Sequence, residues 1–79
     1  MKIEVLGTGC AKCANLENVV KQAIAKSGMF VQLEKVEDMM KIMEYQVVST
    51  PGLVIDGRVV STGKVCSLDE VLGFMDAAK

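Results

Sequence analysis

The sequence predicts a single α/β domain whose elements follow the order β-α-β-α-β-β-α. Three features support this: a β-branched run at 2–6, a helix-spaced apolar run at 12–27, and an Asp56-Gly57 pair between two apolar runs. A right-handed crossover through the first helix makes the first two strands parallel neighbours. The hairpin must join the same sheet to bury its apolar face. We therefore expect a four-stranded mixed sheet in the order 2-1-3-4, with helices on both faces.

The first half of the chain contains two predicted strands and a long helix. The strand at 2–6 runs into Gly7-Thr8-Gly9, which is typical of a tight loop. The helix at 12–27 precedes Gly28, a residue suited to a left-handed C-terminal cap. Residues 30–36 alternate apolar and polar side chains, which predicts the second strand.

A short second helix is predicted from Asp38, which can cap its N-terminus, to about Tyr45. Its apolar side is formed by Met39, Met40, Ile42 and Met43. The methionines could fill the core or bind copper, and we expect them to fill the core.

The last three elements have strong local signals. Residues 52–55 and 58–61 flank Asp56-Gly57, a turn whose two central positions require positive φ. Ser67 and Glu70 form a capping box, which predicts the start of the last helix.

Composition limits the class of protein. The 79 residues fit one domain, residues 1–79, and an apolar content of 51% is ample for its core. A net charge of -1 and few aromatic residues argue against a nucleic-acid partner. No apolar run reaches the roughly 18 residues that span a bilayer, and the N-terminus lacks a signal-peptide pattern. We expect a cytoplasmic monomer with no membrane partner.

The spacing of Cys10 and Cys13 indicates chemistry rather than structural crosslinking. A bridge between them would close a loop of four residues, worth only about 2 kcal/mol in the chain-entropy model. Thiols of cytoplasmic proteins are normally reduced, so a close pair favours redox chemistry or metal binding. Cys66 is the third cysteine, and we expect it to be a small, partly buried residue rather than a second reactive thiol.

Cys10 is predicted to lie at or just before the start of the first helix. Unpaired amides and the helix dipole favour a thiolate there, and Lys12 adds a weaker attraction that tunes the cysteine pKa. The Cys10 thiolate would attack a substrate disulfide, and Cys13 would then resolve the mixed disulfide. Such a couple needs no organic cofactor, because Cys10-Cys13 is itself the redox-active disulfide.

Two alternatives remain open for this pair. The Cys-X-X-Cys spacing also suits a zinc or copper carrier, but a closed zinc site needs four ligands, and the chain offers no histidine and only Cys66 besides. We therefore predict no resident metal. The loop is similar to that of heavy-metal-associated domains, which usually have methionine where this chain has Thr8. The other alternative is a redox-inert binding module.

The whole pattern resembles the thioredoxin-like superfamily, most closely its small, glutaredoxin-sized redox-active disulfide proteins. The resemblance rests on Gly9-Cys10-Ala11-Lys12-Cys13, on residues 49–57 with Ser49-Thr50-Pro51 at their start, and on Thr62-Gly63-Lys64. On local grounds Pro51 would be trans, as most X-Pro bonds are. The resemblance instead implies a cis-proline beside the cysteines, substrate pairing with the backbone of Thr50, and a site-lining turn at Gly63. It also implies protein disulfide substrates and an upstream reductase.

Glu4 stands six residues before Cys10, where thioredoxins keep a buried carboxylate. As a hypothesis, Glu4 acts as a proton relay for Cys13 if burial raises its pKa. The alternative is a solvated strand residue. Ala11-Lys12 replaces the Gly-Pro of thioredoxins, so the sequence leaves the physiological reductant open.

Overall fold

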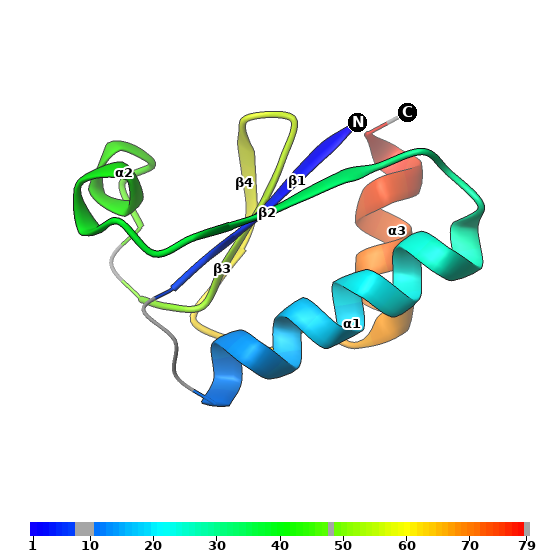
Figure 1. The fold of residues 1–79 in the computed structure, drawn as a ribbon, viewed down its shortest axis with the longest axis horizontal. Coiled ribbons are helices and arrows are strands. Elements are labelled where there is room, and N and C mark those ends of the chain that lie inside the picture. The colour runs from blue at the N-terminus through cyan, green and yellow to red at the C-terminus, as the bar shows by residue number, and fades with distance from the viewer. Residues whose placement is uncertain (8–10, 48, 79) are drawn as a thin grey trace.

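Four strands form one mixed sheet in the order β2-β1-β3-β4, with β1 parallel to β2 and antiparallel to β3 (Figure 1). The computed structural model describes residues 1–7, 11–47 and 49–78. The elements are β1 (Lys2–Leu6), α1 (Ala11–Ser27), β2 (Gln32–Val36), α2 (Met39–Glu44), β3 (Gly52–Ile55), β4 (Arg58–Thr62) and α3 (Leu68–Ala77). The predicted element order and strand order are confirmed.

The local signals of the sequence act as predicted. Gly28 follows α1 with φ 68°, and the β3–β4 turn has φ 50° at Asp56 and 81° at Gly57. The Asp38 side chain caps α2 by accepting from the Met40 amide at 2.9 Å. These residues fix the ends of helices and hairpin independently of the core.

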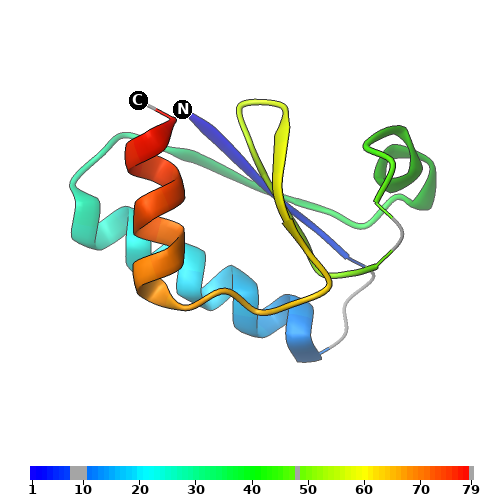
Figure 2. The same ribbon diagram turned by 180° about the vertical axis from the view of Figure 1, so that it is seen from behind.

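The sheet separates two apolar clusters because alternate residues of each strand face opposite sides. The larger cluster lies between the sheet and the helices α1 and α3, which pack against each other (Figure 2). Its buried members include Ile3, Val5, Leu16, Val20, Leu53, Val71 and Met75. The smaller cluster lies on the α2 face and contains Leu6, Val36, Ile42, Val47 and Val54.

The second strand is shorter than predicted. It begins at Gln32, whose amide donates to the Met1 carbonyl at 3.0 Å, and its register with β1 starts at the pair Lys2 and Gln32. Phe30 precedes this pairing and is 98% exposed. The alternation of apolar and polar residues therefore begins two residues before the segment that pairs with β1.

The predicted core role of the methionines is wrong. Met39, Met40 and Met43 are 57%, 71% and 65% exposed, and Ile42 is the buried residue of α2. A helix of six residues has fewer than two turns, and only one of its sides faces the sheet. Its other apolar side chains therefore remain exposed to solvent. Cys66, expected to be partly buried, is almost fully buried with 1% exposure. Within the described ranges, the helices are too short or too polar to cross a membrane.

Candidate active site

Cys13 lies in the first turn of α1 and is fully buried. Its sulfur is next to Gly7, since a Cβ at Gly7 would overlap the Cys13 Sγ and lie 3.1 Å from the Cys13 Cβ. The Gly7 amide donates to the Val36 carbonyl at 2.9 Å, which ties this position to the end of β2. Glycine is therefore needed here for close approach of the helix to the strand end. Cys10, the predicted nucleophile, lies outside the described residues.

Two lysines contribute positive charge near the start of α1. Lys12 is exposed, so solvent weakens its predicted effect on the cysteines. Lys35 of β2 pairs in register with Val5 and so faces the α1 side. The pKa of Lys35 is raised, first by its hydrogen bond to Glu37, whose carboxylate lies 3.2 Å away, with smaller contributions from Glu17 and Cys13. Sequence reasoning missed Lys35, although its place in the strand alternation assigned it to this face.

The predicted substrate-binding residues come together just before β3 and just after β4. The Thr50–Pro51 peptide bond is cis, the isomer that the resemblance implies, and Pro51 is buried while Thr50 is exposed. The Gly63 amide donates to the Pro51 carbonyl at 2.9 Å, and a Cβ at Gly63 would lie 3.1 Å from that of Ser49. Gly63 also has φ 73°, which favours glycine. Thr50, Pro51 and Gly63 thus form one edge of the site.

The sheet brings this edge close to Cys13. Leu6 pairs with Gly52 in the antiparallel register of β1 and β3. The next residue of β1, Gly7, and the residue before β3, Pro51, therefore lie side by side at the same end of adjacent strands. Gly7 contacts Cys13 in the first turn of α1. The start of α1, the cis-proline and the Gly63 turn therefore converge at this end of the sheet.

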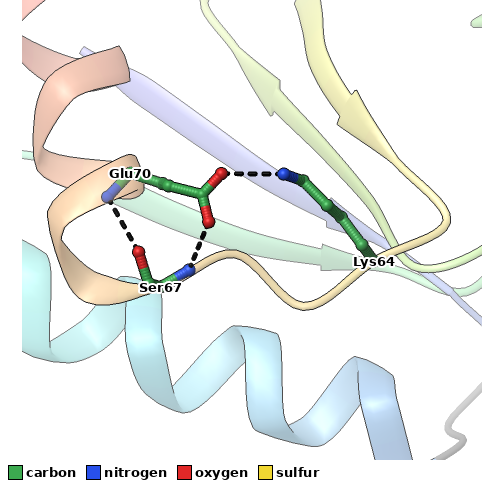
Figure 3. Close-up of polar contacts among 3 residues, drawn as sticks. All are labelled: Lys64, Ser67 and Glu70. Carbon is green, nitrogen blue, oxygen red and sulfur yellow. Dashed lines mark hydrogen bonds and ion pairs between the residues drawn. The ribbon is translucent and has the colours of Figure 1, made fainter.

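The segment after Gly63 is anchored to α3. Lys64 Nζ lies 2.7 Å from a Glu70 carboxylate oxygen, while the other oxygen accepts from the Ser67 amide at 3.1 Å (Figure 3). The Ser67 hydroxyl completes the predicted capping box by accepting from the Glu70 amide at 3.2 Å. One carboxylate therefore caps the helix and holds the residue that follows the turn.

Glu4 is buried, with 9% exposure, so the solvated alternative is wrong. It faces the α2 side of the sheet, and its Oε1 accepts from the Tyr45 hydroxyl at 2.9 Å. This hydrogen bond is the largest cause of the raised pKa of Tyr45. Cys13 belongs to the helix on the other face, so the structure places Glu4 and Cys13 on opposite sides of β1. The proton relay stays a prediction.

A cavity of about 410 Å³ borders this hydrogen bond. Its lining residues are Lys2, Glu4, Glu34, Lys41, Glu44 and Tyr45. Three carboxylates and two ammonium groups give the lining no strong preference for one sign of charge. Sequence reasoning missed the contribution of Tyr45, because no local pattern connects it with a residue 41 positions earlier.

Comparison with known proteins agrees with this arrangement. The thioredoxin domain family matches residues 1–76. A thioredoxin of Methanothermobacter thermautotrophicus is 38% identical over 71 residues, which cover 90% of this chain and 92% of the relative. A thioredoxin of Methanocaldococcus jannaschii is 38% identical over 69 residues, covering 87% and 79% of the two chains. The chain therefore belongs to the thioredoxin domain family.

Proposed function

We propose that this chain is a thiol-disulfide oxidoreductase that reduces protein disulfides with the Cys10-Cys13 couple. Membership of the thioredoxin domain family supports the class of reaction. The observation that carries the proposal is the burial of Cys13 beside Gly7, one strand away from the cis-proline Pro51. This arrangement suits a resolving thiol that is shielded until a substrate is bound.

The reaction proceeds by two exchanges of sulfur. The Cys10 thiolate attacks one sulfur of the substrate disulfide, which breaks the substrate S–S bond, forms a mixed disulfide and releases a thiolate. The Cys13 thiolate then attacks the Cys10 sulfur and releases the second substrate thiolate. The dithiol has lost two electrons and two protons, and the substrate has gained them. An upstream reductase must return two electrons to the Cys10-Cys13 disulfide.

The neighbouring residues have separate roles in this scheme. The backbone of Thr50, an exposed residue, pairs with the substrate chain, while Pro51 and Gly63 form the surface beside the reacting sulfurs. Lys12, exposed at the start of α1, adds the solvent-screened attraction predicted for the cysteine thiolates, whereas the Lys35 ammonium is paired with Glu37. These groups bind and stabilise, whereas the two cysteines exchange bonds.

The experiment is reduction of insulin with dithiothreitol as the electron source. Cys10→Ser should abolish activity, and Cys13→Ser, reduced and then freed of dithiothreitol before it meets insulin, should trap a mixed disulfide that mass spectrometry detects. Cys66→Ser is the matched control, because Cys66 is a buried thiol of the α3 side and should be dispensable. Full activity of Cys10→Ser would refute the proposal. Slow exchange combined with tight binding of copper(I) would favour the soft-metal carrier instead.

The predicted proton relay has its own test. If Glu4 accepts the proton of Cys13, Glu4→Gln should shift the pH profile of the resolving step, measured as release of the mixed disulfide in a rapid-mixing experiment. Unchanged rates across neutral pH would remove the relay and leave the thiol chemistry intact.

A further inference from the structure

The chain that follows α2 leads to Thr50, at the edge of the site. Ile42 is the buried residue of α2, and Val47, with 8% exposure, is the next apolar anchor along the chain. Between them the backbone turns at Gln46, which has φ 59°. The placement of Thr50 therefore depends on how firmly the end of α2 is attached to the sheet.

Tyr45 makes that attachment. It is the C-cap residue of α2, and its hydroxyl donates to Glu4 Oε1 at 2.9 Å. Glu4 is a rigid acceptor because it stands in the middle of β1, in register with Glu34 on one side and Val54 on the other. The bond thus connects the centre of the sheet with the end of α2, from which the chain continues to Thr50.

We propose that Tyr45 is a positioning residue of the oxidoreductase: its hydrogen bond to Glu4 holds the end of α2 so that the Thr50 backbone can pair with a polypeptide substrate. The inference rests on the proposed function and adds a requirement specific to polypeptide disulfides. A small disulfide that reacts with the cysteines alone does not use the Thr50 backbone. Tyr45 should therefore matter for the first kind of substrate and hardly for the second.

Removal of the hydroxyl should leave a folded protein. Tyr45→Phe retains the ring that packs against the α2-face cluster. The cavity beside Glu4 and Tyr45 has room for water, which can replace the lost donor to the carboxylate. The variant thus loosens the attachment without leaving Glu4 unsolvated.

The experiment compares insulin with a small aromatic disulfide, 5,5'-dithiobis(2-nitrobenzoate), as substrates of the full chain. We expect Tyr45→Phe to lower kcat/KM for insulin about five- to tenfold, mostly through KM, because misplacing a substrate-positioning group has effects of this order or larger. The rate with the small disulfide and the cysteine pKa values should stay at wild-type level. The ratio of the two rates is therefore the readout.

One control separates positioning from stability. Gln22→Gly lowers the stability of α1 at an exposed position away from both Thr50 and the Gly63 turn, so it should preserve the ratio of the two rates.

A wild-type ratio in Tyr45→Phe would overturn the inference, as would an equal loss with both disulfides, which would locate the effect at the thiols. Wild-type protein that reduces neither substrate would instead overturn the proposed function.

Discussion

The two faces of the sheet are built differently. On one face the 17-residue α1 and the 10-residue α3 cover a continuous apolar cluster that includes Leu16. On the other, the six-residue α2 covers a smaller cluster around Ile42 and borders a polar cavity. The first face is held by apolar burial, whereas the second combines a smaller apolar cluster with a partly buried hydrogen bond from Tyr45 to Glu4.

This difference matches the two halves of the proposed site. Cys13 belongs to the well-packed face, where its distance from Gly7 is fixed by the helix and sheet together. Thr50 follows the more lightly packed face, where the Tyr45 hydrogen bond to Glu4 holds the end of α2. Under the proposed function, apolar packing therefore places the resolving thiol, whereas a single polar contact helps to place the substrate edge.

Truncation of a buried leucine or isoleucine should show the largest contrast. Leu16→Ala on the α1 side should lower the free energy of unfolding by about 3–5 kcal/mol, because the truncation leaves a cavity that the surrounding large cluster cannot relax to fill. Ile42→Ala on the α2 side should cost about 2 kcal/mol, because a short helix can move inward. Urea denaturation measures both. Equal losses would show that the two faces are packed alike.

Gly7→Ala tests the contact on the well-packed face. The added methyl overlaps the Cys13 sulfur, and we expect a loss of about 1–3 kcal/mol from overpacking. The displaced Cys13 should also resolve more slowly, so that the mixed disulfide accumulates. Gly73→Ala is the matched control: nothing lies within 4 Å of its Cβ position in α3, so it should raise stability by about 0.5–1 kcal/mol. Tolerance of both changes would refute the close approach.

Gln46→Gly tests the segment on the lightly packed face. Gln46 has φ 59°, a conformation that a residue with a Cβ adopts at a cost. Glycine should raise the free energy of unfolding by up to about 1 kcal/mol, since the relief exceeds the added entropy of the unfolded chain. Gln22→Gly in the exposed part of α1 should lower it by about 0.7–1 kcal/mol. A loss at both positions would contradict the proposed strain.

The Tyr45 hydrogen bond should weaken in alkali. The pKa of the Tyr45 hydroxyl is raised above the ordinary value of 10.0 in the folded protein, first by the hydrogen bond to Glu4. A raised folded pKa means that the stabilisation is complete below the unfolded pKa and disappears as the pH rises through the folded value. The stability difference between wild type and Tyr45→Phe should therefore be constant from pH 7 to about 9 and shrink above 10. A difference that grows above pH 10 would exclude this bond as its source.

Local signals account for most of what the sequence predicted. Asp56-Gly57, Gly28 and the Ser67 capping box each fix a turn or helix end through their own backbone chemistry, so neighbouring residues were enough to place them. Pro51 was different: its local sequence favoured trans, and only the family resemblance implied the observed cis bond. The substrate edge was thus predicted by pattern comparison rather than by physics of single residues.

Long-range contacts were missed for a physical reason. The bond between Glu4 and Tyr45 joins residues 41 positions apart, and strand alternation shows only that Glu4 shares a face with Leu6. It does not show which helix covers that face. In the same way, an apolar run such as Met39–Met43 does not reveal how much of a short helix the sheet can cover.

The exposed methionines provide the smallest expected effect and the most direct check of this point. Met40 is 71% exposed on α2, and lysine has a similar helix propensity, so Met40→Lys should change the free energy of unfolding by less than about 0.5 kcal/mol. Met75 of α3 is 1% exposed, and Met75→Lys, which would bury an unpaired ammonium group, should prevent stable folding. Thermal denaturation distinguishes the two. A marked loss in Met40→Lys would mean that the outer side of α2 is packed after all, and the contrast between the faces would fail.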